Sequence, residues 1–236
     1  MTNKKRPEGW NERQKMLKAF TENQNKWYSL IVKKETFIEG KTLLLHSHGM
    51  VHDKKVYKKD IETIYDLLWN NLKPETCRIL TRQGTSIIWN TWHITRIEDL
   101  ISNLLIGSRE TIFNREIQSG LNIKIADVGN SMTNPEIELL NSSMNLKALN
   151  EYRIMVGKST KKILESLEHG DLKRKITPEQ IKKITCNGGV VNDPKSIWLL
   201  DFWGNNNVFG LLKMPITRHQ TLHLLNSFTI KEKSNG

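Results

Sequence analysis

Cysteine and proline are scarce in this 236-residue chain, which has only two and six of them, and long apolar runs are absent. Cys77 and Cys186 lie far apart and outside any CxxC motif, which argues against a disulfide framework or a cysteine-rich zinc site. No stretch of about 18 apolar residues occurs, so we expect no transmembrane helix. The polar N-terminus lacks the apolar segment of a secretory signal, and we therefore expect a cytoplasmic protein.

The chain is basic, with a net charge of +11, and this raises the question of a nucleic-acid partner. Its lysines are scattered in pairs, such as Lys54–Lys55 and Lys161–Lys162, on the solvated faces of expected helices. No zinc finger, helix-turn-helix signature or glycine- and aromatic-rich RNA motif accompanies them. We expect neither a specific nucleic-acid partner nor a membrane partner, and non-specific attraction to polyanions is the alternative.

The apolar pattern predicts an all-α protein, because apolar residues recur at helical spacing and strand alternation is weak. Long helices are expected over residues 59–72, closed by Pro74, and 86–106, capped by Thr85 or Ser86 and ended by Gly107. Two more are expected over residues 146–167 and from Pro215 onward. Shorter helices are expected after Asn134–Pro135, after Thr177, which Pro178 follows, and after Asp193, which Pro194 follows.

Four principal helices joined by long connections predict a helical bundle with crossover connections. Residues 1–56 contain further helical patterns and are expected to form an N-terminal helical extension packed on the bundle. Residues 57–236 are expected to form the bundle itself. No linker divides the chain, so we expect one structural domain overall.

Histidines are placed in a pattern that suggests metal binding. Among seven of them, His48/His52 and His219/His223 have the spacing that puts two imidazoles on one helix face, where both can bind one ion. His93 falls in the middle of an apolar stripe, where a polar group needs a partner. It is the candidate third ligand, because three protein ligands and an open position are typical of a catalytic metal site. The alternative is structural histidines, each paired with a carbonyl or a carboxylate.

Three segments carry a family resemblance: SIIWNTWHITRIED at 86–99, IADVGNSMTNPE at 125–136 and MPITRHQTLHL at 214–224. In this order they resemble the DinB/YfiT-like superfamily of metal-dependent enzymes, and the likeness runs from Tyr57 to Ile230. The resemblance implies a four-helix bundle in which His93, His219 and His223 bind one divalent ion. Imidazole ligands suit zinc, nickel or iron, and the sequence does not choose between them.

The second histidine pair has three interpretations. His48 and His52 resemble a feature of the longer family members only. They could line the pocket and bind substrate, add a ligand or a second metal, or be structural. His46 and His169 belong to no pattern and are expected at the surface.

Three charged residues follow His93 on its helix and are candidates for supporting roles. Arg96 could pair with a carboxylate of a neighbouring helix, and Glu98 or Asp99 could orient a histidine through its second nitrogen. A structural ion pair is the interpretation we favour for all three. Trp89 and Trp92 are expected to pack the bundle rather than to stack on a ligand.

Three functional hypotheses follow. In the first, the protein is an enzyme, because an ion held by neutral ligands keeps its double charge and can acidify a bound water or thiol. The resemblance implies thiol transfer or hydrolysis on a small molecule, with a low-molecular-weight thiol as the candidate substrate. Tyr152 or a carboxylate from another helix is a candidate general base, and the resemblance implies a homodimer as a candidate assembly. The second hypothesis is a metal-bearing binding protein without catalysis, and the third a basic helical protein with structural histidines and an anionic partner.

Overall fold

The computed structural model describes residues 10–58 and 62–234. Within these ranges the regular structure is helical, apart from one isolated bridge between Lys175 and Asn207. The predicted all-α class is therefore confirmed. None of the described helices has the length and apolar character needed to cross a membrane.

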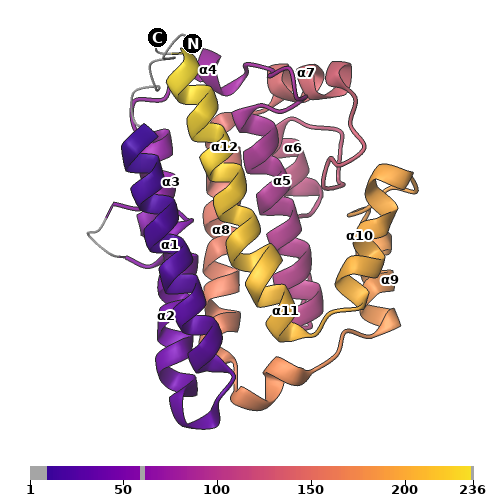
Figure 1. Cartoon of the computed structure of the whole chain (residues 1–236). Helices are drawn as coiled ribbons and strands as arrows, with labels where there is room; N and C mark the ends of the chain where they lie inside the picture. Colours follow the sequence, from indigo (N-terminus) through magenta and orange to yellow (C-terminus); the bar gives the residue numbers. More distant parts are fainter. Residues whose placement is uncertain (1–9, 59–61, 235–236) are drawn as a thin grey trace, which may run out of the picture.

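Five long helices dominate the structure (Figure 1): α1 (Trp10–Ile31), α2 (Phe37–Met50), α5 (Ile87–Asp99), α8 (Leu146–Ser166) and α12 (His219–Ser234). The shorter α-helices are α3 (Ile64–Trp69), α4 (Pro74–Cys77), α6 (Arg115–Leu121), α7 (Asn134–Ser143), α9 (Pro178–Cys186), α10 (Pro194–Gly204) and α11 (Val208–Lys213). The 3₁₀ turns are η1 (Lys34–Thr36), η2 (Lys54–Val56) and η4 (His169–Lys173). Two π-helical stretches, η3 (Leu100–Ile106) and η5 (Met214–Arg218), continue α5 and lead into α12.

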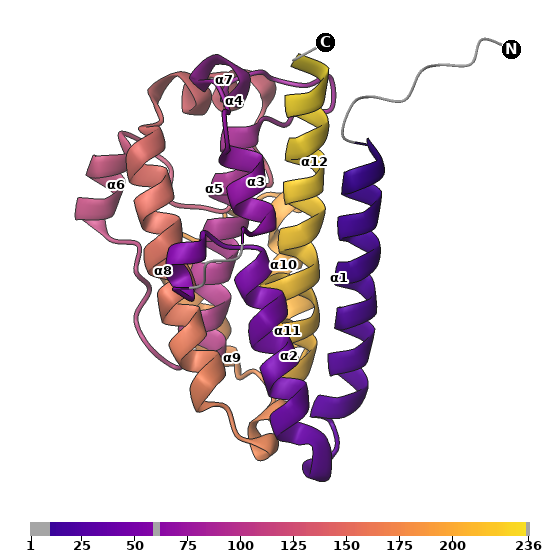
Figure 2. The ribbon, with the colours of Figure 1, turned by 90° about the vertical axis from the view of Figure 1, so that its left-hand side faces the viewer.

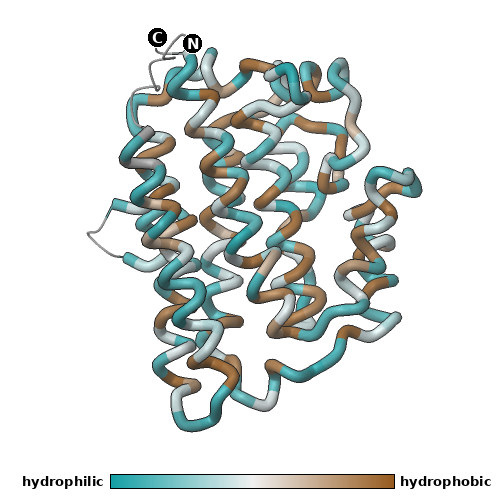
Figure 3. Tube along the Cα trace, viewed as in Figure 1, coloured by the Kyte–Doolittle hydropathy of each residue, from teal (hydrophilic) through white to brown (hydrophobic). Residues whose placement is uncertain are grey.

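Helix α5 lies at the centre of the assembly. It packs against both α8 and α12, while α2 packs on α8 and α1 lies along α2 and α12 (Figures 1 and 2). Hydrophilic and hydrophobic residues alternate at short spacing along the outer helices (Figure 3), as expected for helices with one buried face. All residues of α5 except Trp89 are buried, so its many polar side chains must find partners inside the protein.

Several predicted helix ends are confirmed by their hydrogen bonds. Ser86 caps α5 by accepting from the amide of Trp89, and Asp193 caps α10 in the same way. Thr177 begins α9 with a complete capping box. These side chains satisfy amides that the first turn of a helix leaves unpaired.

The expected helix over 59–72 is shorter than predicted. Residues 59–61 lie outside the described part of the chain, and α3 begins only after Thr63, which forms a capping box with Asp66. The helix ends before Asn71, whose φ of 54° is incompatible with a continuing right-handed helix. Pro74 therefore does not close this helix, contrary to the prediction, but occupies the first turn of α4.

The predicted helix start at Pro215 is wrong: helical backbone already begins with α11 at Val208 and runs through η5 into α12. Proline lacks the amide hydrogen that an α-helix needs, and here the helix widens into the π-helical turn η5 instead of breaking. The amide of His219 donates to the carbonyl of Met214, five residues back, and the Gln220 side chain donates to the carbonyl of Pro215. The helix therefore passes through the proline, and the widened turn directly precedes His219.

Candidate metal centre

The centre is built on α5 and on the connection between α6 and α7. Side chains of α5 donate to four consecutive carbonyls at 126–129: Arg96 to Ala126, Trp92 to Asp127, His93 to Val128 and Trp89 to Gly129, at 2.7, 3.0, 2.7 and 3.2 Å. Such a row of bonds fixes the connection against the helix and holds these side chains in one orientation. The position of His93 is therefore set before any ligand binds.

The structure brings His93, His219 and His223 together, and we call them the triad. One ring nitrogen from each lies within 4.8 Å of the other two, and Nε2 of His93 is 3.2 Å from Nε2 of His219. The α12 pair contributes from one helix face, and the buried His93 faces it from α5. Trp89 stacks on His93 with ring centroids 4.7 Å apart and planes at 10°.

Two of the three imidazoles have their tautomers fixed by neighbouring oxygens. Nδ1 of His93 lies 2.7 Å from the Val128 carbonyl, and Nδ1 of His223 lies 2.8 Å from the side-chain oxygen of Asn90. Both oxygens accept, so in a neutral ring each Nδ1 carries the hydrogen and each Nε2 keeps its lone pair. Two lone pairs thus face the centre of the triad, and His219 can donate a hydrogen to at most one of them. A cation at the centre satisfies all three nitrogens.

Burial keeps the triad neutral. It lowers the pKa of His93 to about 4 and is the largest cause of the lowered pKa of His223, about 3. Burial and the two neighbouring imidazoles hold the pKa of His219 well below its usual range. Imidazole must be unprotonated to bind a metal, so all three rings are ready to coordinate at neutral pH.

The triad opens onto a pocket of about 410 Å³, which we call the triad pocket. The rest of it is lined by Trp89, Ile97, Asn130 and residues of α10 and η5. The chemistry of the donor set fits a divalent ion such as zinc, nickel or iron(II), with an open position toward the pocket. The candidate site therefore consists of the triad, the Asn90 side chain that orients His223, and the triad pocket.

His48 and His52 do not join the triad. They form a second cluster with Glu98, in which Nε2 of His48 is 2.8 Å from one carboxylate oxygen and Nε2 of His52 is 3.0 Å from the other. All three side chains are fully buried. Nδ1 of His48 lies 2.8 Å from the Tyr57 hydroxyl.

The second cluster balances its charge without an ion, although Nδ1 of His52 is buried without a hydrogen-bond partner. Burial by itself raises the pKa of Glu98, but the two imidazoles outweigh it and hold that pKa well below its usual range. Burial lowers the pKa of His52 to about 3, so a neutral ring donates to a charged carboxylate. The buried Arg153, bound to the Val51 carbonyl and to the side chains of Thr95 and Gln220, supplies a balancing positive charge. A divalent ion here would leave an excess positive charge in a dry interior, which is costly.

Gly157 of α8 provides the space for His52. A Cβ at this position would lie 2.6 Å from Nδ1 of His52. Gly157→Ala is therefore expected to destabilise the protein by about 1–3 kcal/mol, although alanine favours helix. The matched control is Gly120→Ala in α6, where an added Cβ meets nothing within 4 Å and stability should stay within about 1 kcal/mol of wild type. Urea unfolding measures both, and equal stabilities would contradict the packing argument.

Arg96, Glu98 and Asp99 do not touch the triad. Arg96 and Asp99 form an ion pair, with Nη1 of Arg96 3.4 Å from an oxygen of Asp99. The Asp99 carboxylate also accepts from the backbone amides of Ile112 and Phe113 and from the Tyr152 hydroxyl. Burial and Asp99 raise the pKa of Tyr152 far above its usual range, and its hydroxyl lies away from the triad pocket lining, so it is not the general base of this site.

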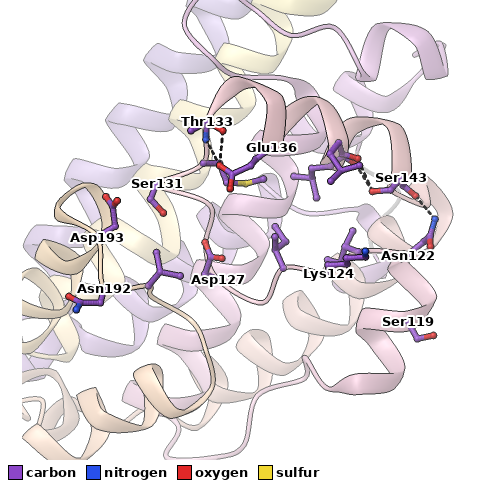
Figure 4. Close-up of a pocket in the computed structure, with 16 residues that line it drawn as sticks. Ser119, Asn122, Lys124, Asp127, Ser131, Thr133, Glu136, Ser143, Asn192 and Asp193 are labelled. Atoms are coloured by element: carbon purple, nitrogen blue, oxygen red, sulfur yellow. Dashed lines mark hydrogen bonds between the residues drawn. The ribbon is translucent and has the colours of Figure 1, made fainter.

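A larger pocket, of about 800 Å³, lies between α6, α7 and the connection at 122–133 (Figure 4). Two of its polar side chains are occupied by local structure: Glu136 accepts from Thr133, and Asn122 donates to the Ser143 carbonyl. Burial raises the pKa of Asp127, whose carboxylate accepts from the Gly129 amide. Neither three-residue cluster found among the described residues lies in this pocket, which favours the triad pocket as the site.

Sequence reasoning missed Asn90, the Val128 carbonyl and the wall formed by α10. Asn90 could have been found, because it lies three residues before His93 and so shares its helix face. The α10 sequence IWLLDFW, at 197–203, has more apolar residues than one buried helix face needs, and this excess could have predicted a second apolar surface on α10. The pairing of His93 with a loop carbonyl has no sequence signal. Trp92 is buried as expected, whereas Trp89 lines the triad pocket.

Comparison of the chain with protein-family models, with curated proteins and with solved structures finds no match. The functional argument therefore depends on the geometry of the site.

Proposed function

We propose that the protein is a metal-dependent enzyme of the DinB/YfiT-like type, which holds one divalent ion at the triad and transfers a thiol or hydrolyses a small molecule. The observation that carries this proposal is the pair of imidazole lone pairs, on His93 and His223, fixed toward each other by the Val128 carbonyl and Asn90. A cation between the rings would satisfy both lone pairs, whereas an N–H of His219 could satisfy only one of them. The sequence resemblance to that superfamily names the same three histidines.

The residues of this chain would have distinct roles. His93, His219 and His223 would hold the ion, and Asn90 and the Val128 carbonyl would orient two of the rings. When bound, a divalent ion would act as a Lewis acid that lowers the pKa of a water or thiol in its open position. Trp89, stacked on His93, would shield one side of the centre from water.

The triad pocket contains no serine, cysteine, lysine or carboxylate side chain in its lining. The chain thus offers no nucleophile for a covalent intermediate there, and the attacking group would have to be a bound thiol or water. The same lack of a general base favours the second candidate, a metal-bearing protein that binds a small ligand without turnover.

The test combines metal analysis with a reaction screen. Wild-type protein made without a histidine tag is incubated with Zn²⁺, Ni²⁺ or Fe²⁺, and elemental analysis is expected to find about one ion per chain. The loaded protein is then assayed for thiol transfer to electrophiles and for ester and amide hydrolysis, beside chelator-stripped protein and His93→Ala. Turnover that both controls lack supports the enzyme, and metal without any turnover favours the binding protein. A chain that stays metal-free with all three ions would falsify both candidates.

A further inference from the structure

The walls of the triad pocket differ sharply from the rest of this basic, charged chain. Apart from the triad and Asn130, the pocket is lined by eight apolar side chains: Trp89, Ile97, Trp198, Leu199, Phe202, Trp203, Met214 and Pro215. The chain has 36 lysines and arginines and 25 acidic residues, yet none of these lines the pocket. An ionised group on a ligand would meet no opposite charge on these walls.

Helix α10 supplies the outer wall, and two of its aromatic rings are exposed to solvent. Trp198 is 50% exposed and Phe202 38% exposed. Their rings lie 6.1 Å apart and are tilted by 60°, so they form two adjoining faces. Exposed apolar groups gathered at the mouth of a pocket are typical of a ligand-binding surface.

Two of the indole N–H groups at this pocket are already used. Trp198 donates to the Lys195 carbonyl, and Trp89 donates to the Gly129 carbonyl. What these residues offer a ligand is therefore ring faces and edges, which favour flat apolar groups. The exception is Asn130, whose side-chain oxygen is buried at the pocket without a hydrogen-bond partner and can accept from a ligand.

We propose that the triad pocket binds a small ligand with a sulfur or oxygen donor at one end and a flat apolar body, such as an aryl group, at the other. The donor lies at the triad, and the body packs between Trp198, Phe202 and Trp89. The placement of the donor end rests on the proposed function, because it needs an ion at the triad. The apolar body narrows the substrate class of that function. A pocket of about 410 Å³ suits a small molecule. A hydrophilic thiol with several charged groups is disfavoured, because those groups would lie against uncharged walls.

The first experiment compares two thiols of similar acidity, benzyl mercaptan and 2-mercaptoethanol, on the Co²⁺-loaded full-length protein. Binding is followed by the near-ultraviolet absorption of a cobalt thiolate. Benzyl mercaptan is expected to bind about tenfold more tightly, because its ring is removed from water. Trp198→Ala should cut this preference to about threefold or less and leave the affinity for 2-mercaptoethanol unchanged. The control Leu139→Ala, an exposed apolar residue of the larger pocket, should keep the tenfold preference.

Equal affinities for the two thiols, or a preference that survives Trp198→Ala, overturn the inference. A wild type that takes up no Co²⁺ overturns the metal proposal alone. The apolar body is then tested on the same metal-free protein with toluene, followed by tryptophan emission, because Trp89, Trp198 and Trp203 line the pocket. A saturable change that Phe202→Ala weakens severalfold supports the apolar subsite. No saturable change rejects it.

Discussion

A His219→Ala/His223→Ala variant is expected to lose its bound ion completely while keeping its helical fold. The variant removes two of the three donors and leaves His93 alone, which cannot hold a divalent ion against chelation by the medium. Both histidines are only partly buried and face the pocket, so their removal leaves no closed cavity in the core. Elemental analysis should fall from about one ion per chain to background, with unchanged far-ultraviolet circular dichroism.

Graded variants make this prediction sharper. Asn90→Ala removes only the oxygen that orients His223, and loss of such a supporting bond should weaken metal affinity by roughly 10- to 100-fold. The matched control is Asn141→Ala, a buried asparagine that accepts from Ser86 and donates to the Arg78 carbonyl, away from the triad. It should lose some stability but no metal affinity. A double histidine variant that still bound one ion per chain would place the metal elsewhere, and the second cluster would be the first place to look.

The sequence predicted the elements of this fold where local chemistry decides them. Helix starts are predicted correctly at Ser86, Thr177 and Asp193, because these N-cap side chains accept hydrogen bonds from amides two or three residues further on. The histidine spacing likewise reflects helix geometry, and the α12 pair does present two imidazoles to one point. Predictions failed where contacts with other residues allow a conformation that the local sequence disfavours. Pro215 does not begin a helix, because α11 continues through it as the π-helical turn η5, in which the amide of His219 donates to the Met214 carbonyl and the Gln220 side chain to the Pro215 carbonyl.

Glu98 shows why the supporting residues could not be assigned from sequence. It lies five residues after His93 on the same helix, and rotation by 3.6 residues per turn places it on a different face. There it meets His48 and His52 of a segment some fifty residues earlier in the chain. Sequence spacing identifies which residues share a helix face, but not which distant helix covers it. By residue type alone, the triad and the second cluster look equally suited to bind a metal, and only the structure distinguishes them.

The second cluster is expected to support the fold rather than hold metal, and Glu98→Gln tests this. Glutamine keeps the shape, and the imidazoles can change tautomer to hydrogen-bond with it, so what is lost is the negative charge. Burial lowers the pKa of Arg153, while the Tyr65 hydroxyl and Glu98 oppose that effect. Glu98→Gln therefore leaves the buried guanidinium without a balancing charge and should cost about 2–4 kcal/mol in urea unfolding, with one ion per chain retained.

A double-mutant cycle tests whether the cost of Glu98→Gln comes from the lost charge balance with Arg153. In a background of Arg153→Met, which removes the buried positive charge, Glu98→Gln should cost about 1–2 kcal/mol less than it does alone. Glu165→Gln is the control for charge removal at the surface, because Glu165 pairs with Lys161 at 3.6 Å and is half exposed, and it should change stability by less than about 0.5 kcal/mol. If the two core substitutions were simply additive, charge balance would not be the reason why Glu98 is there. If Glu98→Gln instead released an ion, the cluster would be a metal site. Because stability and metal content are measured on the same variant, the two roles are told apart in one experiment.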